Sequence, residues 1–261
     1  MKSLMHYPPF LKHTTTAFLV SACLLFWLGL TPVSSAQAEE VKSAEPSVKK
    51  SKRKVRRAQT MRAKIFKKLD HARELSDNKQ YDQALEALEM VKKIRRNSYE
   101  AAMTWNMVAY VHFNQEHYDQ AISAYQQVLA TKKLPASIEQ TTLYSLAKLY
   151  LLQEEYQQAL ASLNNWFSVT DKPGAQAYVL RAQMQYQLKH YTEALPDIKT
   201  AIKLVKSKGQ QPKENWLLVE RAIYFNNKDF KSMERTLKEL ITLYPKPQYW
   251  MQLSAVYNEL G

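Results

Sequence analysis

Histidines are the side chains of this 261-residue chain best suited to metal binding or acid–base catalysis near neutral pH, and six are present. His112 stands at an apolar position of a helical pattern, which favours a packed imidazole over a metal ligand. His117 and His190 occupy equivalent turn positions, and repetition of the sequence accounts for both without a metal. The sequence has no His-x-x-x-His pair, glycine-rich phosphate loop, Gly-x-Ser-x-Gly motif or cysteine pair. It therefore predicts a protein that is not an enzyme and uses no cofactor or metal.

Residues 102–130 contain the structural unit that positions these side chains. The first part carries apolar residues at i, i+3, i+4 and i+7, which is one face of an amphipathic helix. After a turn at residues 115–117, a second helix shows a similar face. The first face consists of Trp105, Val108, Ala109 and His112, and the second of Ala121, Tyr125 and Val128. Neither helix can bury its face alone, so the unit needs copies of itself on either side.

The unit recurs, and its marker is an aromatic residue followed three positions later by a small residue. The markers are Tyr81/Ala84, Tyr118/Ala121, Tyr156/Ala159, Tyr191/Ala194 and the poorer Phe230/Met233, spaced by 37, 38, 35 and 39 residues. A small residue also lies nine positions before the aromatic in four copies, at Ala72, Ala109, Ala147 and Ala182. The fifth copy has Arg221 there. Five copies of one helix pair are therefore predicted.

This pattern resembles the tetratricopeptide repeat (TPR), a helix–turn–helix unit of about 34 residues. The resemblance runs from about Ile65 to the end of the chain. The family's glycines at repeat positions 8 and 15 are missing, and its proline at position 32 appears only as Pro245. The resemblance implies an all-α fold, a right-handed superhelical solenoid of antiparallel helix pairs over residues 61–261. It comprises five full repeats and the first helix of a sixth, Pro247–Gly261, so that the chain stops in mid-repeat.

Some helix boundaries follow from local signals. The first pair is predicted at Met61–Ser76 and Tyr81–Arg96, and the cations that close the second helix suit the negative end of a helix dipole. Ser137 is predicted to cap the third pair's first helix. Pro196 is expected within the first turn of a helix beginning near Thr192, where a proline is tolerated.

In TPR proteins a concave groove is lined by the first helix of each pair, at repeat positions 2, 5, 9, 12 and 13, and the resemblance carries that role to ten residues here. Their amides would pair with the backbone of an extended peptide, and their aromatic rings would pack against its side chains. The alternative interpretation is that they are ordinary exposed helix residues. The ten are Asn106, Tyr110, Asn114, Tyr144, Lys148, Gln183, Tyr186, Gln187, Asn215 and Asn226.

Residues 1–38 have the pattern of a secretory signal peptide. Lysines precede an apolar run over residues 17–30, and the small-x-small sequence Ala36-Gln37-Ala38 follows, which predicts cleavage after Ala38. An uncleaved membrane anchor is disfavoured because the run is shorter than the roughly 20 residues needed to span a bilayer. A lipoprotein signal at Cys23 is also disfavoured, because the apolar core continues past this cysteine.

Residues 39–60 are predicted to be a disordered basic arm. Residues 39–68 hold twelve Lys or Arg and three Glu, a net charge of +9, whereas residues 69–261 carry only +2. Behind an export signal, nucleic acid is disfavoured as a partner, and an anionic surface of phospholipid or acidic protein is favoured. The alternative is a solvated arm that only keeps the protein soluble. The residues predicted to bind the anionic surface are Lys49, Lys50, Lys52, Arg53, Lys54, Arg56 and Arg57.

Beyond the repeat pattern, the segment after residue 38 resembles the periplasmic TPR proteins associated with TonB energy-transduction systems of gamma-proteobacteria. The stretches that carry this resemblance are residues 84–96 (ALEALEMVKKIRR), 118–122 (YDQAI), 215–218 (NWLL) and 248–254 (QYWMQLS). It implies a non-catalytic periplasmic scaffold with protein partners in the cell envelope, accessory to TonB-dependent uptake of iron, siderophores or haem. The competing class is an envelope-assembly adaptor for outer-membrane protein, peptidoglycan or polysaccharide biogenesis.

Overall fold

Residues 60–261 are described by the computed structural model of this protein, and they form eleven α-helices and no strand. The predicted signal peptide and the predicted arm up to residue 59 lie outside the described residues. The helices are α1 (Ala63–Asp77), α2 (Tyr81–Lys92), α3 (Ser98–Asn114), α4 (Tyr118–Leu129), α5 (Ala136–Leu152), α6 (Tyr156–Val169), α7 (Ala175–Gln187), α8 (Tyr191–Lys206), α9 (Glu214–Asn226), α10 (Phe230–Leu243) and α11 (Pro247–Leu260). The all-α class is therefore confirmed. In this part of the chain, no helix is both long and apolar enough to span a membrane.

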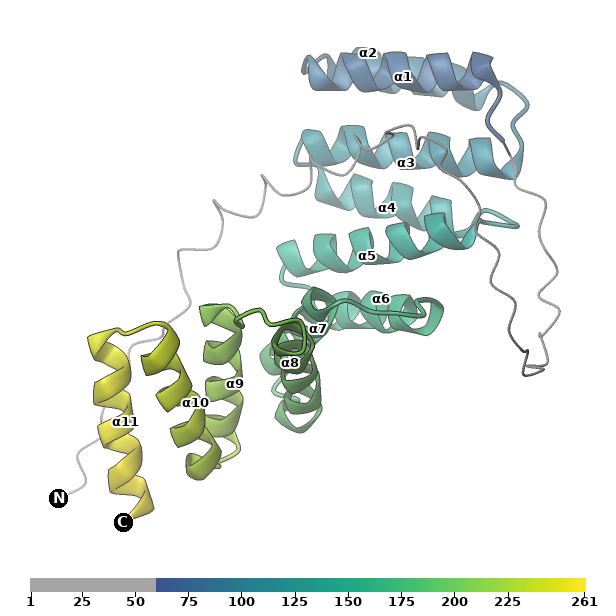
Figure 1. The fold of residues 1–261 in the computed structure, drawn as a ribbon. Helices are drawn as coiled ribbons and strands as arrows, with labels where there is room; N and C mark the ends of the chain where they lie inside the picture. The colour runs from purple at the N-terminus through teal and green to yellow at the C-terminus, as the bar shows by residue number, and fades with distance from the viewer. Residues whose placement is uncertain (1–59) are drawn as a thin grey trace, which may run out of the picture. The chain divides into compact units, whose positions relative to one another are not determined.

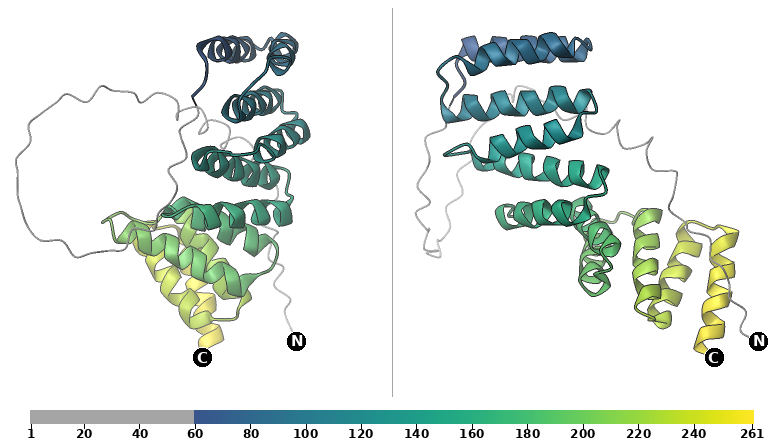
Figure 2. Two further views of the ribbon diagram at one scale, coloured as in Figure 1. Left: turned by 90° about the vertical axis from the view of Figure 1, so that its right-hand side faces the viewer. Right: turned by 180° about the vertical axis from the view of Figure 1, so that it is seen from behind.

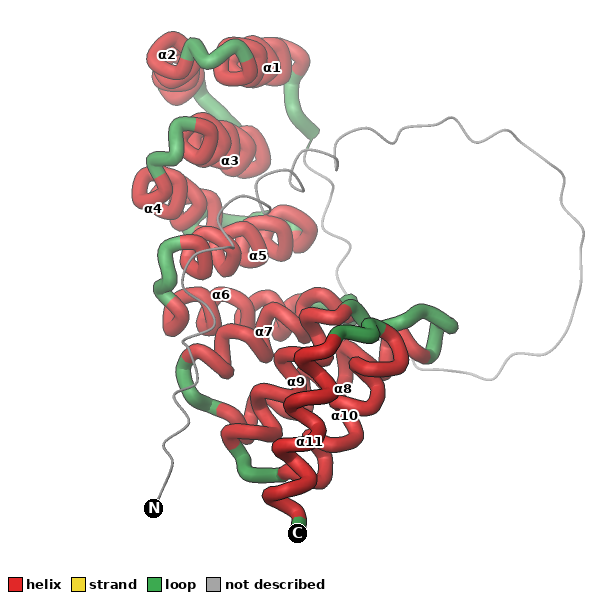
Figure 3. Tube along the Cα trace, turned by 90° about the vertical axis from the view of Figure 1, so that its left-hand side faces the viewer, coloured by secondary structure: helices red, strands yellow, loops and turns green. Residues whose placement is uncertain are grey.

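Successive helices form pairs that stack in chain order, as the views in Figures 1 and 2 agree. The main contacts of each helix are with its neighbours along the chain, and α1 with α3 and α7 with α9 add contacts between repeats. Figure 3 shows the short connections that join the two helices of a pair. The fold is therefore a linear array, in which each pair covers the apolar faces of the next.

Small residues lie where the two helices of a pair approach each other. The eight alanines that mark the first four copies are all fully buried, with no exposed surface: Ala72, Ala84, Ala109, Ala121, Ala147, Ala159, Ala182 and Ala194. In the fifth pair, Met233 is buried and Arg221 donates a hydrogen bond of 2.8 Å to Gln252 of α11. The repeat register predicted from the alanines is confirmed.

The turn inside each of the first five pairs has the same geometry, although it contains no glycine. One residue in each turn adopts a left-handed backbone: Lys79, Glu116, Glu154, Lys189 and Lys228, with φ between 56° and 62°. The amide after it donates back to a carbonyl five residues earlier, as from Gln80 to Leu75 and from His117 to His112. This is the Schellman closure of a helix, and it usually places glycine at the left-handed position. His117 and His190 both follow that position, so a shared turn explains their equivalence.

Three local predictions were wrong. The helix α2 ends at Lys92, not Arg96, because Asn97 begins the next helix through a capping box with Glu100 and the chain must turn before it. Pro135 occupies the cap position of α5 in place of Ser137, since its extended backbone (ψ 139°) already leads into the helix. Pro196 is the sixth residue of α8, beyond the first turn. Because Pro196 lies on the exposed side of the helix, water can reach the carbonyl that it leaves unpaired.

Candidate partner-binding face

All ten predicted groove residues lie on first helices of pairs, namely α3, α5, α7 and α9. None of them is buried: Lys148, Gln187, Asn215 and Asn226 are exposed, and the other six are half-buried. We call the surface that carries these ten residues, together with the equivalent positions of α1 and α11, the first-helix face. The structure divides its polar residues into two groups, those engaged within the chain and those with unused hydrogen-bonding capacity.

The engaged group begins between α1 and α3. The Tyr110 hydroxyl donates to Asp77 Oδ1 at 2.6 Å, and Asn114 Nδ2 donates to Ser76 Oγ at 3.0 Å. Burial, and then the neighbouring Asp77 carboxylate, raise the pKa of the Tyr110 hydroxyl. Arg73 forms an ion pair with Asp77 at 2.9 Å. Tyr110 and Asn114 therefore hold the first two repeats together as well as facing solvent.

Four more predicted residues also have contacts within the chain. The Tyr144 ring lies 5.1 Å from the ring of Trp166, and Lys148 Nζ lies 5.0 Å from the Tyr144 ring. Further along, Asn226 Nδ2 donates to the Ala222 carbonyl at 2.8 Å and lies 3.4 Å from the Tyr186 hydroxyl. These side chains contribute a fixed, partly aromatic surface.

The second group consists of four amides that form no hydrogen bond with another residue of the described chain. They are distributed over α3, α7 and α9, and each is half-buried or exposed. An amide side chain has two donor hydrogens and an acceptor oxygen, which match the C=O and N–H groups of a peptide backbone. The four are Asn106, Gln183, Gln187 and Asn215.

Exposed apolar side chains share this face, and the sequence prediction omitted them. Among the described residues, eight large apolar side chains are exposed, and four of these occupy groove positions. Each of the four has the same repeat position as one predicted groove residue. Phe66 corresponds to Asn215 and is 53% exposed, and Leu152 corresponds to Asn114 and is 41% exposed. Phe225 corresponds to Tyr186 and is 49% exposed, and Met251 corresponds to Asn106 and is 67% exposed. The same positional rule could have found them, and it also gives Arg73 and Asp77 of the first repeat. The prediction began at the second repeat, which left out Arg73 and Asp77, and it selected amide, tyrosine and lysine residues, which left out the apolar ones.

The histidines do not form a site with these residues. His112 is half-buried in α3, with its ring 6.2 Å from the ring of His117. Burial, and then the neighbouring His117, lower the pKa of the His112 imidazole. Within residues 60–261, no three His, Cys, Asp or Glu side chains gather in a geometry that could hold a metal ion.

An array of stacked helix pairs with amides and exposed apolar groups on one face defines a helical-repeat protein of the class that binds other proteins. Its family is the tetratricopeptide repeat: the family model matches residues 69–138, 107–166 and 144–208, which together cover more than half of the chain. The chain belongs to this family. TPR proteins are generally non-catalytic interaction scaffolds, and a protein partner is accordingly the class of ligand that the fold implies. No curated protein matches the sequence.

Solved structures of TPR proteins share the fold at low sequence identity. YrrB, described as a TPR protein with an unusual peptide-binding site, superposes with a TM-score of 0.56 at 14% identity, over 72% of this chain and 90% of YrrB. A tetratricopeptide repeat protein from Parabacteroides merdae gives 0.55 at 18% identity, over 76% and 73% of the two chains. MamA gives 0.51 at 18% identity, over 61% of this chain and 82% of MamA. At these sequence identities, the similarities show that the proteins share a fold.

Proposed function

We propose that this protein is a scaffold that holds an extended segment of a partner protein along the first-helix face. The observation that carries the proposal is the mixture on that face of unpaired amides with exposed apolar side chains. Asn106 and Gln183 have no partner within the described chain, whereas Phe66 and Leu152 expose apolar surface. An extended peptide provides both complements, because its backbone offers hydrogen bonds and its side chains offer apolar surface.

The chemistry of the face indicates which segments would fit. Its charged groups are few, and Arg73 and Asp77 are already paired with each other. The face therefore suits a segment with apolar side chains and little net charge. Amide–backbone hydrogen bonds would set the register of the segment, and burial of its apolar groups would supply most of the affinity. YrrB, which shares the fold, is described as a TPR protein with a peptide-binding site, and this supports peptide binding as a function that the fold can serve.

The more specific form of the proposal is an accessory role in the periplasm beside a TonB-dependent system for uptake of iron, siderophores or haem. It is supported by the predicted signal peptide and by the resemblance of residues 84–96 and 248–254 to periplasmic TPR proteins of TonB systems. In this role the basic arm would keep the protein at the anionic surface of the inner membrane, while the first-helix face binds a component of the complex.

A second candidate function is that of an envelope-assembly adaptor, which the same array and export signal would also serve. Growth distinguishes the two roles. A deletion strain should grow poorly when siderophore- or haem-bound iron is the sole iron source. Normal growth there, together with leakage of periplasmic proteins or misassembled porins, would favour the envelope-assembly role.

The face itself is tested by crosslinking and co-purification from the native host. Replacing Asn106, Gln183 and Gln187 by Ala should greatly reduce partner capture, and it should leave helicity unchanged because these amides bond to no described residue. The matched control replaces three exposed amides on second helices, Gln83, Gln120 and Gln157, and should capture the partner like the parent protein. Equal capture by all three proteins would refute binding at the first-helix face.

A further inference from the structure

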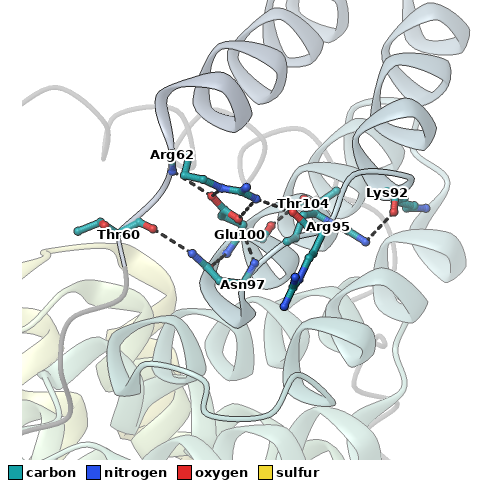
Figure 4. A network of polar contacts seen from close by, with 8 residues as sticks. Thr60, Arg62, Lys92, Arg95, Asn97, Glu100 and Thr104 are labelled. Atoms are coloured by element: carbon teal, nitrogen blue, oxygen red, sulfur yellow. Dashed lines mark hydrogen bonds and ion pairs between the residues drawn. The ribbon is translucent and has the colours of Figure 1, made fainter.

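One end of the first helix pair gathers cations from two segments that are well separated in the sequence. Because α1 and α2 are antiparallel, the start of α1 lies beside the end of α2 (Figures 1 and 4). A direct contact fixes this arrangement, since Arg62 Nη2 donates to the Arg95 carbonyl. The cations at this end are Arg62, Lys64, Lys67, Lys68, Lys92, Lys93, Arg95 and Arg96.

Charge is segregated along this helix pair. The end with eight cations has only two carboxylates, Glu89 and Glu100, and these pair with Lys92 at 2.6 Å and Arg62 at 2.8 Å. The rest of the pair, residues 70–86, has five acidic and two basic residues. Five cations at the basic end are exposed and form no ion pair with any side chain of residues 60–261: Lys64, Lys67, Lys68, Lys93 and Arg95. We call these five residues the basic end.

Helix stability explains only part of the basic end. Cations are favourable near a helix C-terminus, which accounts for Lys92 and Lys93 at the end of α2. Lys64 and Lys67 lie at the opposite kind of terminus, near the start of α1, where the dipole disfavours positive charge. The first turn of α1 contains no acidic residue. A charge pattern that opposes a local stability rule is expected where function requires it.

We propose that the basic end is a docking surface for an anionic lipid bilayer. This inference rests on the proposed function, because it assigns part of the membrane attachment to the folded array. Four of its five residues are lysines, whose compact charges on flexible stems suit diffuse attraction to many headgroups better than recognition of one phosphate. The exposed Phe66 lies two positions from both Lys64 and Lys68 and therefore on another face of α1, so its ring is not beside these two lysines.

The test is co-sedimentation of the full chain with vesicles of phosphatidylcholine, with and without phosphatidylglycerol. Replacing all five residues of the basic end by Gln should weaken binding to the anionic vesicles by roughly tenfold or more at low salt, since each nearby cation adds to the attraction. Replacing Lys64, Lys67, Lys68 and Lys93 by Arg should preserve binding. A matched control neutralises five exposed lysines elsewhere in the array and should bind like the parent protein: Lys172, Lys203, Lys208, Lys213 and Lys231.

Several results would overturn this inference. One is equal loss in the control variant, which would show that total charge alone matters. Another is parent-like binding by the five-residue Gln variant while deletion of residues 48–57 abolishes binding, which would assign the attachment to the arm. A third is stronger binding to poly-glutamate or to RNA than to anionic vesicles, with the same five residues required. The Asn106/Gln183/Gln187→Ala variant should bind vesicles like the parent protein, so failure of the proposed peptide binding is detected separately.

Discussion

Arg62 surrounds the carboxylate of Glu100 with three nitrogen atoms, although 38 residues separate the two in the chain. Its backbone N and Nε lie 2.9 and 2.8 Å from Oε1, and Nη2 lies 2.8 Å from Oε2. The backbone N–H of Asn97 donates a further hydrogen bond of 3.0 Å to Oε2, and the Glu100 side chain has no exposed surface. This contact attaches the residue before α1 to the start of α3, as Figure 4 shows.

The first prediction is a pH dependence of stability that arises from Glu100. Hydrogen bonds from Arg62 lower the pKa of Glu100 to about 2. A carboxyl whose pKa is lower in the folded than in the unfolded chain stabilises the fold at neutral pH, and it loses that effect as the pH falls from its ordinary pKa of about 4.3 towards 2. Glu100→Gln should therefore reduce the free energy of unfolding by about 1–3 kcal/mol at pH 7. Urea unfolding of both proteins measures this.

The same comparison at pH 3 should show a smaller difference, because much of the stabilisation is then lost in the parent protein as well. Glu89→Gln is the control, since Glu89 is 61% exposed and its ion pair with Lys92 lies at the surface. It should change stability by less than about 1 kcal/mol. A constant difference between Glu100→Gln and the parent protein from pH 7 to pH 3 would contradict the prediction.

The second prediction concerns the left-handed turn residues. Lys79→Gly and Lys228→Gly should each raise the free energy of unfolding by about 0.5–1 kcal/mol. The relief of left-handed strain, about 1–2 kcal/mol, exceeds the entropy that glycine adds to the unfolded chain. Glycine one position earlier, at Asn78 or Asn227, should give no gain, because φ there is −84° and −81°. Thermal unfolding followed by circular dichroism decides between these outcomes.

The third prediction is that enlarging the small contacts destabilises a pair. Ala109→Leu and Ala121→Leu place extra volume where both alanines have no exposed surface, and each should cost about 1–3 kcal/mol. Ala161→Leu, on the exposed side of α6, should stay within about 0.5 kcal/mol of the parent protein. Unchanged melting of the first two variants would argue against the helix packing described above.

The fourth prediction is export with cleavage after Ala38. Amino-terminal sequencing of the protein isolated from its native host should begin at Glu39-Glu40. A product that begins at a lipidated Cys23, or one that keeps Met1, would refute cleavage at this position.

The sequence was sufficient for the fold, because one chemical requirement recurs at regular spacing. Alanines such as Ala109 and Ala147 recur where the two helices of each of the first four pairs touch, so their repetition predicts both the pairs and the register. The sequence was not sufficient to predict the polar contacts between side chains. Whether Tyr110 faces solvent or bonds to Asp77 depends on the distance between repeats and on side-chain rotamers, and periodicity contains neither. The end of α2 was also missed, since the cap at Asn97 competes with a helical pattern that continues to Arg96.

The nearest-neighbour packing of the array has a mechanical consequence. Because the main contacts of each helix are with adjacent elements, a load applied to the two ends of the described array passes through every interface in series. Such a structure can lengthen by small changes of angle at many joints before any joint separates, and it yields first at the weakest one. It would behave as a soft spring, able to tolerate relative movement of whatever is attached to its ends.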